Sequence, residues 1–344
     1  MLTTSVGPTV PMATASRRFS AAVAHAFESL DDRAIERPAR SGPLALRLHF
    51  ASSELADAFN VFLPPLPGSS PVLEICFTTS RYVNLSDAVP QRIAGHAALA
   101  NDDVYALWQF DSQHLLHIVD FASRRAVVWL GDDFAPAWLC SRPILAPIHA
   151  VLLRTPWVPL HGGAVSLNGR TLLLAGIGRA GKTTAALACA LAGWDYAGDD
   201  FVLVNSQTAL VEPLFTSARL RNDLSSVFPG ILDARAEISH EDGEVRHELR
   251  MEHVLQPDQL TGGKAAALLL PRRRGAERPE FEPARPIDAF NALLTMTVTL
   301  TPGWPDLVSK KLMSVIGLAP IFFIDTGATP NAIPDAFAEF LHRL

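Results

Sequence analysis

Residues 160–200 read LHGGAVSLNGRTLLLAGIGRAGKTTAALACALAGWDYAGDD, and this stretch decides the fold class. Within it, residues 176–183 match the pattern GxxxxGK[ST] in full. An apolar segment comes directly before them, and a run of good helix formers, 183–191, follows until Gly193. A strand that runs into a glycine-rich loop and then a helix is the setting in which this motif holds phosphate groups. The sequence therefore predicts an α/β unit built around a phosphate loop.

The segment ahead of the loop predicts a β-hairpin. Asn168-Gly169 suits a type I′ turn, because both central residues of that turn need positive φ. Short strands at 164–167 and 170–175 flank the dipeptide, and the second strand leads into the loop. Two further strands are expected at 194–197 and 201–204.

The loop has the chemistry of a phosphate site. Its glycines allow backbone N–H groups to turn toward phosphate oxygens, and the N-terminus of the following helix adds the positive end of its dipole. Lys182 would reach the β- and γ-phosphates of ATP, and Thr183 would offer its hydroxyl to Mg²⁺. The candidate nucleotide-binding residues are Gly176, Gly178, Arg179, Ala180, Gly181, Lys182, Thr183 and Thr184.

Two adjacent carboxylates and a histidine complete the candidate site. Asp199 and Asp200 come one helix and one short strand after the loop, where they face it from the end of the neighbouring strand. One carboxylate there can help to hold Mg²⁺, and the other can accept a proton from an attacking hydroxyl. His161 precedes the hairpin, so it either reaches the γ-phosphate or Asp199, or it serves as a structural residue.

These residues resemble the nucleotide-binding core of HPr kinase/phosphorylase and its relatives. The likeness rests on a His-Gly ahead of a hairpin, the phosphate loop, the helix and the close Asp-Asp pair, and its specific part covers residues 160–204. A looser likeness runs to the C-terminus through SARLRND at 217–223 and an expected strand at 265–270. The short interval between the loop and the aspartates is shared with the phosphoenolpyruvate carboxykinase-like P-loop fold, to which that family belongs.

The resemblance implies a kinase that moves the γ-phosphate of ATP, with Mg²⁺, onto a serine hydroxyl. His161 matches the family's active-site histidine, and Lys182 and Thr183 match its phosphate and metal residues. Asp199 matches the aspartate usually assigned as the general base, and Asp200 matches the partner on the metal side.

Three differences separate the chain from the classical enzyme. Gly178-Arg179 stands where the family usually has Ser-Gly. The C-terminal signature linked to dephosphorylation has no clear copy, so phosphorylase activity is not expected. The first 150 residues look more like those of divergent relatives found beside ribosomal-peptide tailoring systems, including lasso-peptide kinases. By that analogy the acceptor is a peptide or small protein rather than HPr.

Other charged residues fit either a site or a plain surface. Arg219 and Arg221 are candidates for contacts with the transferring phosphoryl group or the acceptor, or they belong to a surface loop. Arg272–Arg274 is followed by glutamates and is expected in a solvated loop. His114 and His117 lie in an alternating strand pattern without partner cysteines, so structural roles are expected rather than zinc binding.

The composition excludes several classes of protein. The 344 residues carry a net charge of −6, which argues against a nucleic-acid binder that works through phosphate contacts. No apolar run approaches the roughly 18 residues of a membrane span. Cys76, Cys140 and Cys189 are far apart and odd in number, which favours free thiols in a reducing cytoplasm. Apolar residues make up 49%, which suits a buried partner surface or a homo-oligomer.

The chain is expected to hold two main units in an α/β, or more broadly α+β, architecture. Residues 1–40 are expected to form a flexible tail and a short helix, and residues 41–142 a smaller β-rich domain. Residues 143–156 are expected to form a linker helix, and residues 157–344 the catalytic domain. The β-rich unit either docks a partner peptide as an added strand or packs in an oligomer.

Two other functions stay open at the level of sequence. The first is a nucleotide-binding regulatory or assembly module with little or no transfer activity. The second is a kinase of a small metabolite.

Overall fold

A computed structural model describes residues 12–32, 34–88, 96–110, 114–131, 145–176, 178–221, 227–228, 231, 235–239, 245–272, 274–300, 303–326 and 329–344. Helices make up 31% and strands 37%, and the sheets mix parallel with antiparallel pairs, so the protein is α+β. No helix of the described residues is long and apolar enough to cross a membrane.

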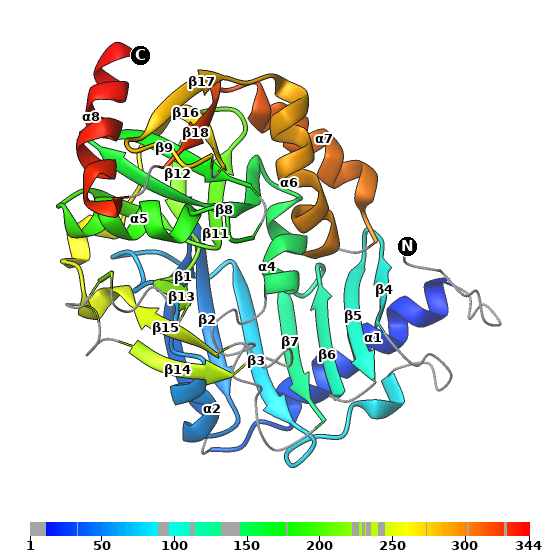
Figure 1. Cartoon of the computed structure of the whole chain (residues 1–344). Coiled ribbons are helices and arrows are strands. Elements are labelled where there is room, and N and C mark those ends of the chain that lie inside the picture. Colours follow the sequence, from blue (N-terminus) through cyan, green and yellow to red (C-terminus); the bar gives the residue numbers. More distant parts are fainter. Residues whose placement is uncertain are drawn as a thin grey trace.

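The elements have the following bounds (Figure 1). The α-helices are α1 (Met12–Glu28), α2 (Ser53–Ala58), α4 (Leu145–Leu152), α5 (Lys182–Leu191), α6 (Pro286–Leu300), α7 (Pro305–Ile316) and α8 (Ile333–Arg343). Short 3₁₀ helices are η1 (Ser86–Ala88), η4 (Met251–His253), η5 (Pro257–Gln259) and η6 (Pro330–Ala332).

The strands fall into three sheets. The first holds β1 (Ile35–Ser41), β2 (Leu44–Phe50), β3 (Leu73–Thr79), β4 (His96–Ala100), β5 (Val104–Phe110), β6 (His114–Asp120) and β7 (Arg125–Leu130). The second holds β8 (Trp157–Leu167), β9 (Arg170–Ala175), β10 (Asp195–Gly198), β11 (Phe201–Asn205), β12 (Val211–Pro213), β16 (Lys264–Arg272), β17 (Glu280–Pro283) and β18 (Ile321–Asp325). The third holds β13 (Ser217–Arg221), β14 (Arg235–Ser239) and β15 (Val245–Arg250).

The first sheet has the order β1-β2-β3-β7-β6-β5-β4 and is covered on both faces. Helix α1 lies across one face (Figure 1), where Phe19 and Val23 are buried with Cys76 and Leu116 in one apolar core. Helix α4 lies against the other face, where Ile148 is buried in a second core. Burial on both faces explains why the strands of this sheet read as apolar runs more often than as strict alternation.

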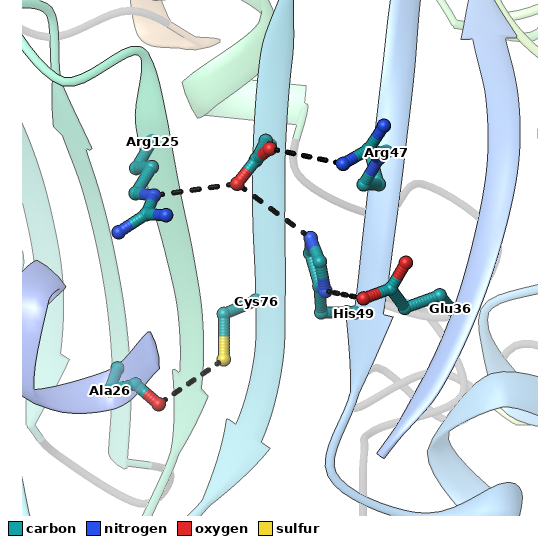
Figure 2. Close-up of polar contacts among 7 residues, drawn as sticks. Ala26, Glu36, Arg47, His49, Cys76 and Arg125 are labelled. Atoms are coloured by element: carbon teal, nitrogen blue, oxygen red, sulfur yellow. Dashed lines mark hydrogen bonds and ion pairs between the residues drawn. The ribbon is translucent and has the colours of Figure 1, made fainter. Parts of the chain in front are cut away.

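A polar network on the α1 face surrounds Glu74 of β3 (Figure 2). Its carboxylate lies 3.6 Å from Arg47 Nη1, 3.4 Å from Arg125 Nε and 3.8 Å from His49 Nε2. His49 Nδ1 in turn lies 3.4 Å from Glu36 on β1. The network joins β1, β2, β3 and β7, but several members are exposed, so its contribution to the free energy of unfolding is small.

The thiols that the structure describes are buried and free, as the sequence predicted. Cys76 lies on the same face of β3, with its sulfur 3.9 Å from the carbonyl oxygen of Ala26 on α1 (Figure 2). Burial raises the pKa of the Cys76 thiol to about 12, and it raises the pKa of Cys189 as well. Thiols with such pKa values are poor nucleophiles. Cys140 lies outside the described residues.

Two buried histidines make the stability of the fold depend on pH. Burial lowers the pKa of His117 and of His149 to about 3. The unfolded chain binds protons at both rings below its ordinary pKa of about 6.5, whereas the folded chain does not until the pH nears 3. We therefore expect the free energy of unfolding to fall, as the pH drops from 6.5 toward 3, by about 1 kcal/mol per pH unit for each histidine.

Urea unfolding of the wild type and of His117→Leu between pH 7 and pH 4.5 checks this expectation. Neither ring nitrogen of His117 has a hydrogen-bond partner among the described residues, so leucine removes a titrating group without breaking a described hydrogen bond. The variant should show a smaller loss of stability per pH unit. Equal pH slopes for the two proteins would contradict the prediction.

The second sheet has the order β12-β11-β8-β9-β16-β18-β17, and β10 also pairs with β8. Its central pairs β9–β16 and β16–β18 are parallel, and the other pairs are antiparallel. Helices α5 and α8 cover one face, and α6 and α7 cover the other (Figure 1). The sheet is therefore a buried layer between two pairs of helices.

The hairpin of this sheet has the predicted form. Leu167 pairs with Arg170, and the two residues between them have positive φ, 53° at Asn168 and 73° at Gly169. Helix α5 follows the loop as expected, and Gly193, with φ of 90°, comes just after its end.

The first and second sheets share one apolar core. Phe201 and Leu203 of β11 are buried together with Leu46 and Phe50 of β2. The hydroxyl of Ser41 donates to the carbonyl oxygen of Leu214, 2.9 Å away. The β-rich half is thus packed directly against the strand that follows the Asp-Asp pair.

Several elements differ from the sequence prediction. The short helix expected within residues 1–40 corresponds to α1, which already begins at Met12. Strand β1 lies within residues 1–40, where the sequence predicted no strand. The edge strand was not recognised because Pro38 and the charged residues around it are untypical of a strand. Strand β17 lies in the expected loop after Arg272, and α7 was not predicted. Helix α4 lies within residues 143–156, between β7 and β8 in chain order.

Candidate active site

Strand β8 brings the parts of the candidate site together through its register. His161 pairs with Phe201 of β11, next to Asp200. Gly162 pairs with Ala175, the last residue before the glycine-rich loop. The loop and the Asp-Asp turn therefore flank the same two residues of β8 from opposite sides. The LHGG segment of β8 therefore lies between the loop and the Asp-Asp turn.

The loop forms an open cradle at the N-terminus of α5. Gly181 is the N-cap residue, with φ of 102°, and its lack of a side chain leaves the first N–H groups of α5 without a side-chain cap. Gly176 and Arg179 also have positive φ, 156° and 68°. Backbone N–H groups at a helix N-terminus suit an anion. Ile177 lies outside the described residues.

Lys182 is buried beneath this cradle, with a side chain that folds back onto the loop. Its residue is 7% exposed, and its Nζ donates a hydrogen bond to the carbonyl oxygen of Gly176, 2.8 Å away. Burial lowers the pKa of Lys182, and the nearby charge of Asp199 opposes that shift. Because this ammonium group is partly shielded from water, its electrostatic attraction to phosphate oxygens would be stronger than in bulk solvent.

Asp199 contacts the residue that the loop motif assigns to metal binding. The hydroxyl of Thr183 donates to its carboxylate, with distances of 2.9 and 3.1 Å to the two oxygens. Asp199 is 6% exposed. A Cβ at Gly163 would lie 3.5 Å from Oδ1, so the second glycine of LHGG keeps the space beside this carboxylate open.

Asp200 faces His161 instead. Its Oδ1 lies 3.4 Å from His161 Nδ1, and the His161 ring stands edge-on to Phe201 with the centroids 5.2 Å apart. Asp200 has φ of 68°, and Gly198 has φ of 132°. The Gly-Asp-Asp turn therefore holds a strained backbone that points its two carboxylates at different partners.

The donor set fits the groups that the sequence implies. Mg²⁺ in nucleotide sites is usually held by one or two carboxylates, a hydroxyl and the oxygens of the substrate. The Thr183 hydroxyl and the Asp199 carboxylate supply that kind of partial set. Within the described part of the chain, no group of three or more His, Cys, Asp or Glu side chains forms a complete metal cage. Such a site would need phosphate oxygens to complete it.

The remaining predicted residues lie at different places. Thr184 is buried in the first turn of α5, and Gly178 and Arg179 are exposed on the loop. Arg219 and Arg221 lie on β13, in the third sheet. Their neighbours Ala218 and Leu220 pack in the core of α5, so the arginines belong to the opposite sheet face. Arg219 is buried and pairs in register with Glu248.

Sequence reasoning missed the contribution of the parallel strands. Because β9, β16 and β18 are parallel, their carboxyl ends share the edge where the loop lies. Thr326, just after β18, has its hydroxyl oxygen 3.3 Å from where a Cβ of Gly181 would be. Pro271 lies near the start of the loop, 3.8 Å from the corresponding Cβ position at Gly176. Only the strand order could have revealed these neighbours.

The two glycines of LHGG should differ sharply in their tolerance to alanine. A Cβ at Gly162 would lie 2.5 Å from the backbone oxygen of Leu174, which cannot move without disturbing the hairpin. We expect Gly162→Ala to lower the free energy of unfolding by about 3 kcal/mol. Gly163→Ala is the matched control, since its Cβ meets only ordinary contacts of 3.5 Å or more. Urea unfolding measures both, and similar losses for the two variants would count against the described register.

Comparison with known proteins adds no family to this geometry: no family model matches the chain, and no curated protein matches it.

Proposed function

We propose that the chain is a Mg²⁺- and ATP-dependent kinase that transfers the γ-phosphate to a serine hydroxyl of a peptide or small protein. One observation carries the proposal. The register of β8 brings three parts together. They are a GxxxxGKT loop, a carboxylate that is hydrogen-bonded to the threonine of that loop, and a second carboxylate beside a histidine. Phosphoryl transfer depends mainly on positioning and electrostatic stabilisation, and these three parts would supply a phosphate site, a metal ligand and a proton acceptor.

Nucleotide binding falls to the loop and the start of α5. Backbone N–H groups around Gly181 would hold the phosphates, and the Lys182 ammonium would turn from the carbonyl of Gly176 toward the γ-phosphate. Thr183 and Asp199 would hold Mg²⁺, which when bound neutralises charge on the phosphate oxygens.

The contacts favour an order of the two aspartates opposite to the one that the resemblance implies. Asp199 accepts the hydroxyl of Thr183, which is the relation expected of a residue on the metal side. Asp200 is then the proton acceptor, oriented by His161. The serine oxygen attacks the γ-phosphorus, its proton passes to the Asp200 carboxylate, and the bond from the γ-phosphorus to the bridging oxygen breaks to release ADP.

The choice of a serine on a peptide rests on the resemblance to the HPr kinase-like family. The same resemblance supports a phosphoenolpyruvate carboxykinase-like core, and the mixed second sheet with its loop at the carboxyl end of β9 is compatible with it. The α+β class by itself would suit many functions.

Mass spectrometry on fractionated acceptors tests this proposal. A soluble extract of the source cells is separated by size into a polypeptide and a metabolite fraction, and each is incubated with the protein, ATP and Mg²⁺. We expect the mass of a peptide or small protein to rise by one phosphoryl group at a serine. Phosphate appearing only in the metabolite fraction would identify a small-molecule kinase. ATP bound without any product would favour the regulatory module.

A further inference from the structure

A pocket of about 410 Å³ lies where the edge strand β1 meets the segment that holds η4 and η5, and none of the candidate active-site residues lines it. Its walls are mainly apolar and include Phe50, Phe59, Phe62, Leu63, Pro65 and Leu260. This volume is that of a site for a small ligand or for one or two side chains of a partner. Its lining comes from both halves of the chain.

Three charged residues line the pocket, namely Glu252 and two arginines of β1, and the two arginines differ in their hydrogen bonds. Arg37 donates to the carbonyl oxygen of Ala56 over 2.8 Å and to Asp57 over 3.2 Å. Among the described residues, the side chain of Arg40 has a single 3.3 Å hydrogen bond, from Nη1 to the carbonyl oxygen of Gly42, and a loose 4.0 Å contact with Glu212.

Arg40 is also largely removed from water. Its side chain is 15% exposed, and its buried Nε has no hydrogen-bond partner among the described residues. Burial lowers the pKa of Arg40, and the Glu212 charge opposes this shift only in part. A guanidinium has five N–H donors, and donors without a hydrogen-bond partner in a site shielded from water cost free energy. A carboxylate matches their fork-shaped geometry best.

The edge of β1 beside the pocket is closed to an added strand. Arg40 and Leu63 exchange both backbone hydrogen bonds, over 2.9 and 3.1 Å. The next residues that would extend this pairing are Pro38 and Pro65, which have no N–H to donate. At this edge, therefore, a partner must be recognised by its side chains rather than by its backbone.

We propose that this pocket binds a peptide segment in which an aromatic or aliphatic residue lies next to an acidic one. The apolar side chain enters among the phenylalanines, and the neighbouring carboxylate pairs with Arg40. The occupant is the acceptor peptide, and this part rests on the proposed kinase function. Thr216 lines the pocket and directly precedes β13, the strand that carries Arg219 and Arg221. A segment bound in the pocket thus lies beside the start of that strand.

Fluorescence anisotropy with three blocked peptides tests the proposal without ATP. The probe is amino-terminally labelled Gly-Phe-Glu-Leu-Ser amide, compared with versions that carry Gln or Lys in place of Glu. We expect the Glu peptide to bind the wild type about tenfold more tightly than the Gln peptide, and the Lys peptide to bind least. Arg40→Gln should remove this preference, and Arg40→Lys should keep part of it.

Arg47→Gln is the matched control, because Arg47 lies on the adjacent strand and contacts Glu74 rather than this pocket (Figure 2). It should keep the full preference for Glu, and thermal unfolding of each variant shows whether it is folded. Equal binding of the three peptides, or a Glu preference that survives Arg40→Gln, overturns the proposal. If the peptides bind as expected but are never phosphorylated, the kinase proposal fails and the pocket proposal stands. If peptides are phosphorylated equally well with and without the acidic residue, the kinase proposal stands and the pocket proposal fails.

Discussion

Asp200→Asn is expected to lower the rate of phosphoryl transfer by about 10²- to 10⁴-fold, the range that a positioned general base supplies. The amide keeps the size of the side chain but cannot take the proton of the attacking hydroxyl. Because Asp200 lies beside His161, whereas Asp199 accepts the Thr183 hydroxyl, the affinity for ATP and the Mg²⁺ dependence should stay near those of the wild type. Single-turnover transfer and equilibrium binding of ATP separate these quantities.

Asp199→Asn is the matched control for this prediction. Its carboxylate accepts the Thr183 hydroxyl, so the amide should raise the Mg²⁺ concentration needed for half-maximal rate. A magnesium titration of both variants therefore tells the two roles apart. If Asp200→Asn shifts the Mg²⁺ dependence and Asp199→Asn does not, the assignment implied by the resemblance is right and ours is wrong.

Lys182→Ala is expected to weaken ATP binding by about 10- to 100-fold, the range for a lost hydrogen bond to a charged group. It should also lower the transfer rate by about 10²- to 10³-fold, since in the proposed mechanism the ammonium would turn toward the charge that develops on the γ-phosphate. Burial of Lys182 within the loop makes both effects large.

Two further variants serve as controls for the Lys182 prediction. Lys182→Met keeps most of the volume of the side chain without its charge, so it should lose binding and transfer as the alanine does. Lys264→Ala removes an exposed lysine at the start of β16 and should change neither. Wild-type ATP affinity in both Lys182 variants, with the proteins folded, would show that the loop does not hold the nucleotide.

Local signals in the sequence predicted the hairpin, the loop and α5. Asn168-Gly169 can form only a few turns, and Gly193 ends a helix by its freedom at positive φ. These features depend on neighbours in the chain, which is why they could be read directly.

Features that depend on distant pairing could not be predicted. Strand β1 carries Pro38, which reads as a break until its place at the sheet edge is known. Thr326 joins the loop only because β18 runs parallel to β16. Asp199 contacts Thr183 and Asp200 contacts His161 because Asp200 has a positive φ. The local sequence does not predict this backbone conformation.

Transfer of label from γ-labelled ATP in the presence of Mg²⁺ tests the central claim most directly. The acceptor is a size-fractionated soluble extract of the source cells, and Asp200→Asn is the control enzyme. We predict that label appears on a serine of a peptide or small protein with the wild type and is lost with the variant. Label that stays in ATP or appears only as free phosphate, with every polypeptide fraction unlabelled, would contradict the account.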